Sequence, residues 1–218
     1  MMAFTNPVTW VAGATLTAAE LNEQVRDNSL AGGPIYTTET ARDAAIPTPY
    51  EGQRAYITSP TVTSPTGATF AGLPTGIQTV YNGSIWVCVT PIAAITTTSG
   101  TTTSTAFTPT LTGGGTNPSV TIVTGPTALI TQTAHLSNST TGAGAYMTVA
   151  VSGATTVAAT ADLALHNGGT GGAFFLASAT VLISALSGGA NTFTLAYKCG
   201  TSGTSTFAQR QLIVRGVA

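Results

Sequence analysis

The sequence predicts a mainly β protein whose C-terminal part is an antiparallel β-sandwich or jelly roll. Thr is the commonest of its 218 residues, and a branched Cβ favours strands over helices. After about residue 119, short apolar runs alternate with small polar side chains and are separated by Gly, Asn and Ser. Hydrophobic residues make up 43 % of the chain, which is enough for a packed core.

Charged residues make up only 6 % of the chain, against roughly 25 % in ordinary soluble domains. They are unevenly placed, because the segment 55–161 contains none. A disordered segment is normally charged and poor in apolar residues, so this neutral, apolar-rich stretch is expected to fold. A monomer with net charge −1 and so few surface charges tends to associate. We therefore expect a defined oligomer that buries much of the neutral surface.

Residues 1–34 are predicted to form an N-terminal anchor around a short helix. Thr17-Ala18-Ala19-Glu20 matches a capping box, in which the Thr hydroxyl and the Glu carboxylate accept hydrogen bonds from free N–H groups of the first turn. Leu21 and Val25 share one face, and Gly32-Gly33-Pro34 ends the helix. Three turns are marginal alone in water, so the helix is expected to dock on symmetry mates or another protein, or else on its own domain.

Residues 35–94 are predicted to form a small β module. Residues 40–43 begin a short helical turn, and residues 53–58 have the composition of a strand. Residues 79–89 have the pattern of a hairpin, in which Asn82-Gly83 suits a type I′ turn. Three aromatic residues are expected to form its small core: Tyr56, Tyr81 and Trp86.

Residues 95–118 are predicted to be a Thr/Gly-rich linker, and residues 119–218 the C-terminal β-sandwich. The expected strands of the sandwich are 119–123, 128–136, 145–151, 157–166, 174–186, 191–198 and 207–215. The run Phe174 to Leu186 is apolar on both faces, whereas a strand of a two-layer sandwich normally has one solvated face. We therefore expect a subunit interface on its outer side.

No catalytic constellation can be assembled from the residues. Glycoside hydrolysis needs two carboxylates flanking the bond, and the C-terminal part contains one acid, Asp162. A site shared between subunits with Glu51 is the disfavoured alternative. No nucleophile, base and orienting group occur at a recognisable spacing, and the basic residues form no cluster for nucleic acid. The sequence therefore predicts a protein that is not an enzyme and holds no cofactor.

Metal binding is also not predicted, because the soft ligands are scattered singly along the chain: Cys88, His135, His166 and Cys199. A ring of one His per chain on a three-fold axis is the exception, since His135 alternates with Thr131 and Thr133 and is free to point inward. The two cysteines are interpreted as buried free thiols. The N-terminus lacks the pattern of a signal peptide and no apolar run suits a membrane span, so synthesis in a reducing cytoplasm is expected.

Five stretches carry a resemblance to a known family: residues 9–22, 25–28, 41–47, 51–56 and 81–86. They resemble the N-terminal modules of structural proteins from tailed bacteriophages, especially those of actinobacteria, of the minor tail, fibre or head-decoration type. The match covers roughly the first 90 residues. The C-terminal part is similar in style to trimeric jelly-roll knobs, and residues 210–215 to the closing strand of such knobs, which is an analogy of fold alone.

This resemblance implies a virion protein, made in the bacterial host, that binds itself as a homotrimer and other phage proteins of the tail or capsid. The implied role is a tail fibre or minor tail protein, with a capsid decoration protein or head fibre as the alternative and a polysaccharide-degrading spike as the third hypothesis. Tyr146 and Tyr197 are the expected surface recognition residues, facing a host glycan. The expected anchor and oligomer contacts are Phe4, Trp10, Leu16, Leu21, Val25, Arg26 and Asp27.

Overall fold

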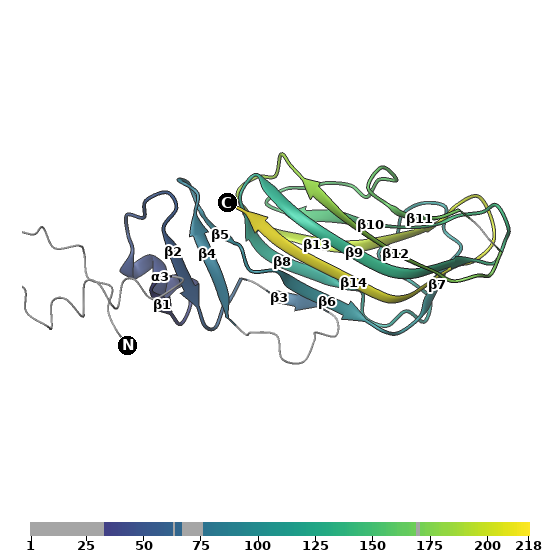
Figure 1. The fold of residues 1–218 in the computed structure, drawn as a ribbon, viewed down its shortest axis with the longest axis horizontal. Helices are drawn as coiled ribbons and strands as arrows, with labels where there is room; N and C mark the ends of the chain where they lie inside the picture. The colour runs from purple at the N-terminus through teal and green to yellow at the C-terminus, as the bar shows by residue number, and fades with distance from the viewer. Residues whose placement is uncertain (1–32, 63, 67–75, 169–170) are drawn as a thin grey trace, which may run out of the picture.

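The computed structural model describes residues 33–62, 64–66, 76–168 and 171–218 (Figure 1). Strands make up 51 % of the structure and helix 4 %, so the protein is mainly β, with one short helix and several antiparallel sheets. None of the helical residues within these ranges forms a helix long and apolar enough to cross a membrane. The predicted N-terminal helix lies outside the described residues.

A small four-stranded sheet carries the short helix. Its strands lie in the order β1-β2-β4-β5, with β1 parallel to β2 and the other pairs antiparallel. The strands are β1 (Ile35–Tyr36), β2 (Arg54–Ile57), β4 (Ile77–Tyr81) and β5 (Trp86–Cys88), and the helix is α3 (Glu39–Ala45). Thr38 caps α3, because its hydroxyl accepts a hydrogen bond from the Ala41 N–H.

The loop between β4 and β5 differs from the predicted type I′ turn. Tyr81 pairs with Trp86, so four residues form the loop, and only Gly83 of the Asn82-Gly83 pair has a positive φ, of 89°. The Asn82 side chain instead accepts hydrogen bonds from the N–H groups of Ser84 and Ile85. This side-chain turn replaces the left-handed conformation that a type I′ turn requires at its first central residue.

The predicted aromatic core of the small sheet is correct for two of its three members. Trp86 is buried, and the Tyr81 ring packs edge-on against it at a centroid distance of 5.5 Å. Tyr56 is half-buried and lies on the other face of β2 from Ala55 and Ile57, both of which are fully buried. Strand alternation therefore turns Tyr56 away from Trp86.

The remaining strands of the described residues form two five-stranded sheets that face each other (Figure 1). Sheet I has the order β11-β10-β13-β8-β3, and sheet II has the order β12-β9-β14-β6, with β7 also paired to β14. The strands of sheet I are β3 (Ser64–Thr66), β8 (Ser119–Thr124), β10 (Ala145–Gly153), β11 (Leu165–Asn167) and β13 (Gly189–Cys199). Those of sheet II are β6 (Ile92–Thr96), β7 (Gly100–Thr102), β9 (Thr127–Asn138), β12 (Phe175–Ile183) and β14 (Ser205–Val217).

Alternation along the long strands places the core between the two sheets. Every second residue of β9 is buried from Ala128 to Leu136, and β8 and β13 show the same period of two. The fully buried side chains of this core include Val120, Ile122, Ile130, Leu136, Met147, Phe193, Leu195, Phe207, Leu212 and Val214. The one expected strand that largely fails is 157–166, of which only residues 165–166 belong to a strand, β11.

The predicted linker at 95–118 is wrong, because this segment belongs to the two-sheet body. β6 and β7 both pair with β14, and the backbone of Thr108 exchanges two hydrogen bonds with that of Tyr197. Arg210 holds the segment there, and the orientation of Arg210 depends on a bulge in β14 between Ala208 and Gln211, where Gln209 has a φ of 50°. The bulge reverses the alternation of the strand, so Arg210 points inward.

Arg210 holds the supposed linker in place. Its side chain is 1 % exposed and donates hydrogen bonds to the backbone carbonyls of Thr98, at 3.1 Å, and of Gly114. It also donates to the Tyr197 hydroxyl at 3.0 Å. A low-complexity composition alone does not reveal that a distant cation binds the carbonyls of the segment.

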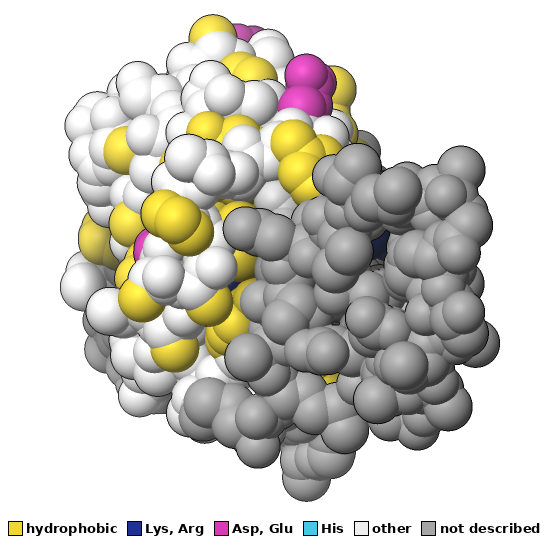
Figure 2. All heavy atoms as spheres, turned by 90° about the vertical axis from the view of Figure 1, so that its left-hand side faces the viewer, with side chains coloured by type: hydrophobic (Ala, Val, Ile, Leu, Met, Phe, Trp, Pro, Cys, Tyr) yellow, Lys and Arg dark blue, Asp and Glu magenta, His cyan; other side chains and the backbone are white. Residues whose placement is uncertain are grey.

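The small sheet packs directly onto one end of the two-sheet body, beside the C-terminus (Figure 1). Val87 of β5 is fully buried there, and a Cβ on Gly216 would lie 2.5 Å from its Cγ1 atom. Gly216 is therefore required by close approach rather than by backbone conformation. Figure 2 views the molecule from the small-sheet end, where uncharged polar and hydrophobic side chains predominate in the described part and few charged ones are visible.

Candidate functional site

A row of three side chains crosses the outer face of sheet I. Tyr146 on β10 lies opposite His166 on β11 and opposite Lys198 on β13. The rings of Tyr146 and His166 stack, with their centroids 4.3 Å apart and an interplanar angle of 24°. The Lys198 Nζ atom lies 4.7 Å from the centroid of the Tyr146 ring, which is within range of a cation–π interaction. Tyr146 therefore occupies the surface position that the sequence predicts, with two partners that it did not indicate.

A fourth side chain, Phe107, extends this row into a hollow. Its ring centroid lies 5.0 Å from the Lys198 Nζ atom, on the side of β13 that faces away from β10. Phe107 also lines a hollow of about 530 Å³ above sheet I. The other residues lining this hollow are small or uncharged: Pro109, Ala150, Val151, Ser152, Ala158, Ala159, Thr194 and Ala196. We call the four side chains and this hollow the ring surface.

Tyr146, His166 and Lys198 lie near the end of the body away from the small sheet, and the hollow extends from there back along β10 and β13. β14 runs between the two ends, because its Gly216 adjoins Val87 of the small sheet while its Ser205 pairs with Asn138 at the other end. The Asn138 side chain donates to the Sγ atom of Cys199, which directly follows Lys198. Tyr146 therefore lies far from the small sheet, and its role in recognition stays a prediction.

Tyr197 is not a surface residue, so its predicted role in surface recognition is wrong. It is fully buried, and its hydroxyl donates to Asn117 Oδ1 at 2.5 Å and accepts from Arg210. Burial raises the pKa of Tyr197 to about 12, and the adjacent Arg210 charge opposes part of that rise. Tyr197 follows the core alternation of β13 with Phe193 and Leu195, whereas the neighbouring Lys198 points outward.

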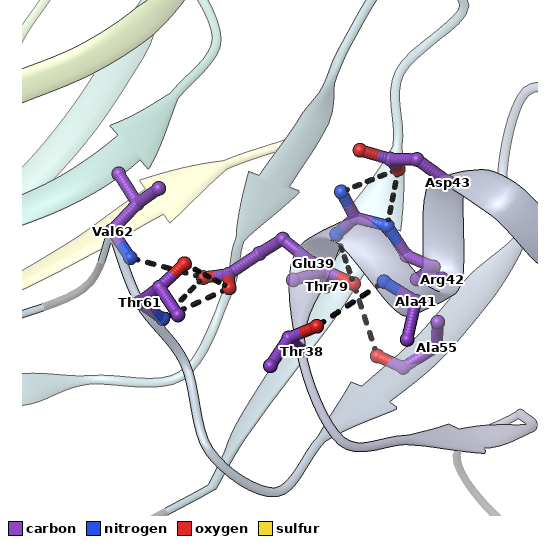
Figure 3. Close-up of polar contacts among 9 residues, drawn as sticks. All are labelled: Thr38, Glu39, Ala41, Arg42, Asp43, Ala55, Thr61, Val62 and Thr79. Atoms are coloured by element: carbon purple, nitrogen blue, oxygen red, sulfur yellow. Dashed lines mark hydrogen bonds and ion pairs between the residues drawn. The ribbon is translucent and has the colours of Figure 1, made fainter.

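A second hollow, of about 430 Å³, lies beside α3 and contains most of the charges of the small module (Figure 3). The Arg42 guanidinium lies 4.6 Å from the Trp86 ring centroid, pairs with Asp43 at 2.8 Å and donates to the Thr79 hydroxyl. Arg42 is 5 % exposed. Arg42 therefore joins helix α3 to the small sheet.

Glu39 in the same hollow holds the loop that follows β2. Its carboxylate accepts hydrogen bonds from the N–H and hydroxyl of Thr61 and from the N–H of Val62 (Figure 3). Burial alone raises the pKa of Glu39, but these hydrogen bonds outweigh it and the pKa is lowered. A catalytic general acid needs a raised pKa, so Glu39 is poorly suited to donate a proton.

The expected anchor residues Phe4, Trp10, Leu16, Leu21, Val25, Arg26 and Asp27 lie outside the described residues. Within the described ranges, no three His, Cys, Asp or Glu side chains gather to hold a metal ion. His135 lies on the outer face of sheet II with Thr131 and Thr133, as their alternation predicts, and its ring centroid is 6.5 Å from that of Phe174. Cys199 is a buried free cysteine, as predicted, and Cys88 is also buried.

Sequence reasoning missed three members of the ring surface. His166 was considered only as a metal ligand, and Phe107 lay in the segment interpreted as a linker. Lys198 is the single lysine of the chain, and that rarity was the one available signal. The pairing of Tyr146 with both His166 and Lys198 depends on strand register, which the sequence does not specify.

The comparisons with known proteins give no family. No protein-family model matches the chain, and neither does any curated protein. The chain is similar to one in a structure of infectious bursal disease virus, Gx strain, at 13 % identity and a TM-score of 0.33, covering 70 % of this chain and 42 % of that one. It is also similar to the isomalto-dextranase of Arthrobacter globiformis T6 complexed with panose, at 14 % identity and a TM-score of 0.31, covering 89 % and 41 %. The chain thus spans less than half the length of either, and at these TM-scores neither likeness carries an argument.

Proposed function

We propose that this chain is a non-enzymatic structural protein of a bacteriophage particle, a homotrimeric tail fibre or minor tail protein. Its N-terminal segment anchors it to other virion proteins, and its two facing sheets form an outward knob of the jelly-roll kind. Support comes from the phage-like residues of the first 90 positions and from the mainly β architecture with few surface charges. The knob presents the ring surface on the outer face of sheet I.

The observation that carries the proposal is an exposed apolar edge on sheet II. Phe174, Phe175, Leu176 and Leu182 are 56–61 % exposed, and all four lie on or beside β12. Together they expose on the order of 400 Å² of apolar surface, spread from one end of β12 to the other. β12 is also an edge strand, since it pairs with β9 alone. Such an edge is normally covered in a native protein.

The face beside this edge is neutral and suited to self-association. Thr131 pairs with Thr180 and Thr133 with Ser178 through hydroxyl hydrogen bonds of 2.9 and 2.8 Å. These pairs satisfy the polar side chains internally, so another copy is able to cover them at little desolvation cost. Within the described part of β12 and β9 there is no charged residue to repel an identical surface. Such a face favours association with closed point-group symmetry, and the homotrimer proposed here is one such assembly.

Two other functions are retained as alternatives. A capsid decoration protein or head fibre uses the same parts. A polysaccharide-degrading spike is disfavoured, because Asp162 is the single acid of residues 119–218 and Glu39 has a lowered pKa. Locating the protein on phage particles by antibody-labelled electron microscopy separates tail from capsid. Release of reducing sugar from polysaccharide by the purified protein would favour the spike.

The self-association is tested by introducing charge on the exposed edge. The double variant Leu176→Asp/Leu182→Asp is expected to weaken association by more than about 100-fold, because it buries unpaired carboxylates. Sedimentation velocity at a fixed micromolar concentration measures the effect. Thr156→Asp, an exposed loop residue on the side of sheet I, is the control and should keep the native mass. An unchanged mass in the double variant would contradict the assigned interface.

A further inference from the structure

We propose that the ring surface binds an acidic polysaccharide, with a sugar ring against Phe107 and a sugar carboxylate on Lys198, which the Tyr146 ring holds in place. This inference rests on the proposed function, since it specifies what the outward knob recognises. It follows from three properties of the surface: its charge, its exposed rings and its hydroxyl-lined hollow.

The charge of the ring surface is positive and lacks an internal counterion. Within the described residues, the Lys198 ammonium lies on the faces of Phe107 and Tyr146 and makes no ion pair. None of the residues lining the hollow carries a carboxylate. The two rings hold the ammonium in one place, so less side-chain freedom is lost when a carboxylate arrives. A carboxylate on the ligand forms a charge-assisted hydrogen bond that a neutral sugar lacks.

The rings indicate a sugar rather than another acidic polymer. His166 and Lys198 cover the two faces of the Tyr146 ring, so the ring left as a flat platform is Phe107, which is half-buried at the edge of the hollow. The apolar C–H face of a pyranose suits such a platform, because it removes apolar surface from water without desolvating the hydroxyls on the ring edge. A nucleic acid is disfavoured, because one lysine is not the basic cluster that phosphate backbones require.

The hollow beside Phe107 has room for the next sugars of the chain. Its volume of about 530 Å³ lies in the range of pockets that hold small ligands, and small side chains such as Ala150 and Ala196 keep it open. Ser152 and Thr194 place hydroxyls on its wall. These groups both donate and accept, so they suit the hydroxyls of a sugar. The hollow and Lys198 lie on the same face of β13, opposite to the proposed interface on sheet II.

The test compares three probes of similar length on the intact protein: an oligogalacturonate, a neutral malto-oligosaccharide and oligo-glutamate. We expect the oligogalacturonate to bind in isothermal titration calorimetry, at least 10-fold more tightly than either other probe, with an affinity that falls as salt rises. Lys198→Met should weaken its binding at least 10-fold, and Phe107→Ala should do the same. Arg54→Met, which removes an exposed charge from the small sheet, is the matched control and should not change it.

Three outcomes would overturn the inference. If the malto-oligosaccharide bound as tightly as the oligogalacturonate, and Lys198→Met left its binding unchanged, charge would have no role in recognition. Equal binding of oligo-glutamate would remove the role of the sugar. Absence of oligogalacturonate binding would remove the site. The native mass of each sample is measured in parallel: an oligomer that fails to bind contradicts this inference alone, whereas a monomer contradicts the proposed function whichever probe binds.

Discussion

Each half of the molecule buries one arginine against an aromatic ring, but the two charges are neutralised differently. Arg42 of the small module lies over Trp86 and pairs with the carboxylate of Asp43, its neighbour in sequence. Arg210 of the two-sheet body has its guanidinium carbon 5.3 Å from the Tyr197 ring centroid and, within the described residues, makes no ion pair. A chain with few charges thus uses two of its six basic residues internally.

The difference shows how a buried cation without a counterion can hold distant segments of the chain together. Arg210 is surrounded by oxygen atoms from distant segments, among them the carbonyls of Thr98 and Gly114. Carbonyl dipoles offset part of the cost of burying the charge, and they also bring the Thr/Gly-rich segment onto the body. Arg42 joins only nearby elements, so its loss should have a smaller effect.

The largest effect is expected from Arg210→Met. The substitution leaves buried carbonyls and the Tyr197 hydroxyl with fewer donors, and we expect it to lower the free energy of unfolding by about 3–5 kcal/mol. Urea unfolding at pH 7 and fixed protein concentration measures it. Arg54→Met, at an exposed position, should change stability by less than about 0.5 kcal/mol. Similar losses of unfolding free energy in the two variants would show that Arg210 does not hold the Thr/Gly-rich segment on the body.

A smaller effect is expected from Arg42→Met in the small module. The variant loses the cation–π contact with Trp86 and the hydrogen bond to Thr79, while Asp43, whose side chain is 57 % exposed, remains hydrated. We therefore expect a loss of about 1–2 kcal/mol in the same urea experiment. A loss of unfolding free energy equal to that of Arg210→Met would contradict the difference between the local contacts of Arg42 and the long-range contacts of Arg210.

The pH dependence of stability should distinguish the two regions at high pH. The folded-state pKa of Tyr197 is about 12, above the ordinary value of 10.0, so the folded protein holds this proton more tightly than the unfolded chain. Its contribution is complete below pH 10 and is lost as the pH rises toward 12. Burial also raises the pKa of Tyr36, so wild type must be compared with Tyr197→Phe. The variant should show a shallower decline above pH 10, and identical slopes would contradict the assignment.

The smallest effect is expected at low pH, from Glu39. Its folded-state pKa is lowered below the ordinary 4.5, so its contribution is present above that value and is lost as the pH falls. Glu39→Gln should remove part of the acid dependence, with little change in stability at pH 7 because the side chain is partly exposed. Thermal unfolding between pH 3 and 7 measures it. A variant with the same acid profile as wild type would show that the hydrogen bonds from Thr61 contribute nothing.

Much of the fold was predictable because it depends on alternation. The period of two in residues 128–136 and 191–198 places the right side chains inside, and the apolar run from Phe174 matches an exposed edge strand. The packing of residues 95–118 on the two-sheet body was not predictable. It depends on a bulge at Gln209 that turns Arg210 inward, and no local sequence pattern indicates this bulge.

The candidate site was predictable only in part, for the same reason. Tyr146 stands out as an aromatic residue on the polar side of a strand, whereas the alternation around Phe193 and Leu195 already placed Tyr197 inside. Its partners depend on which strands pair and in what register, a property of the folded sheet. Phe107 reaches the surface through a loop of the supposed linker, which composition alone does not position.

The central claim is that copies of this neutral, β-rich chain cover one another's exposed apolar surface. The native mass of the purified full-length protein tests it most directly, by mass spectrometry under non-denaturing conditions. The account predicts a species of three chains, each of 21.7 kDa, which dissociates when Leu176 and Leu182 are replaced by Asp. A stable single chain at micromolar concentration, with the β12 edge open to solvent, would contradict it.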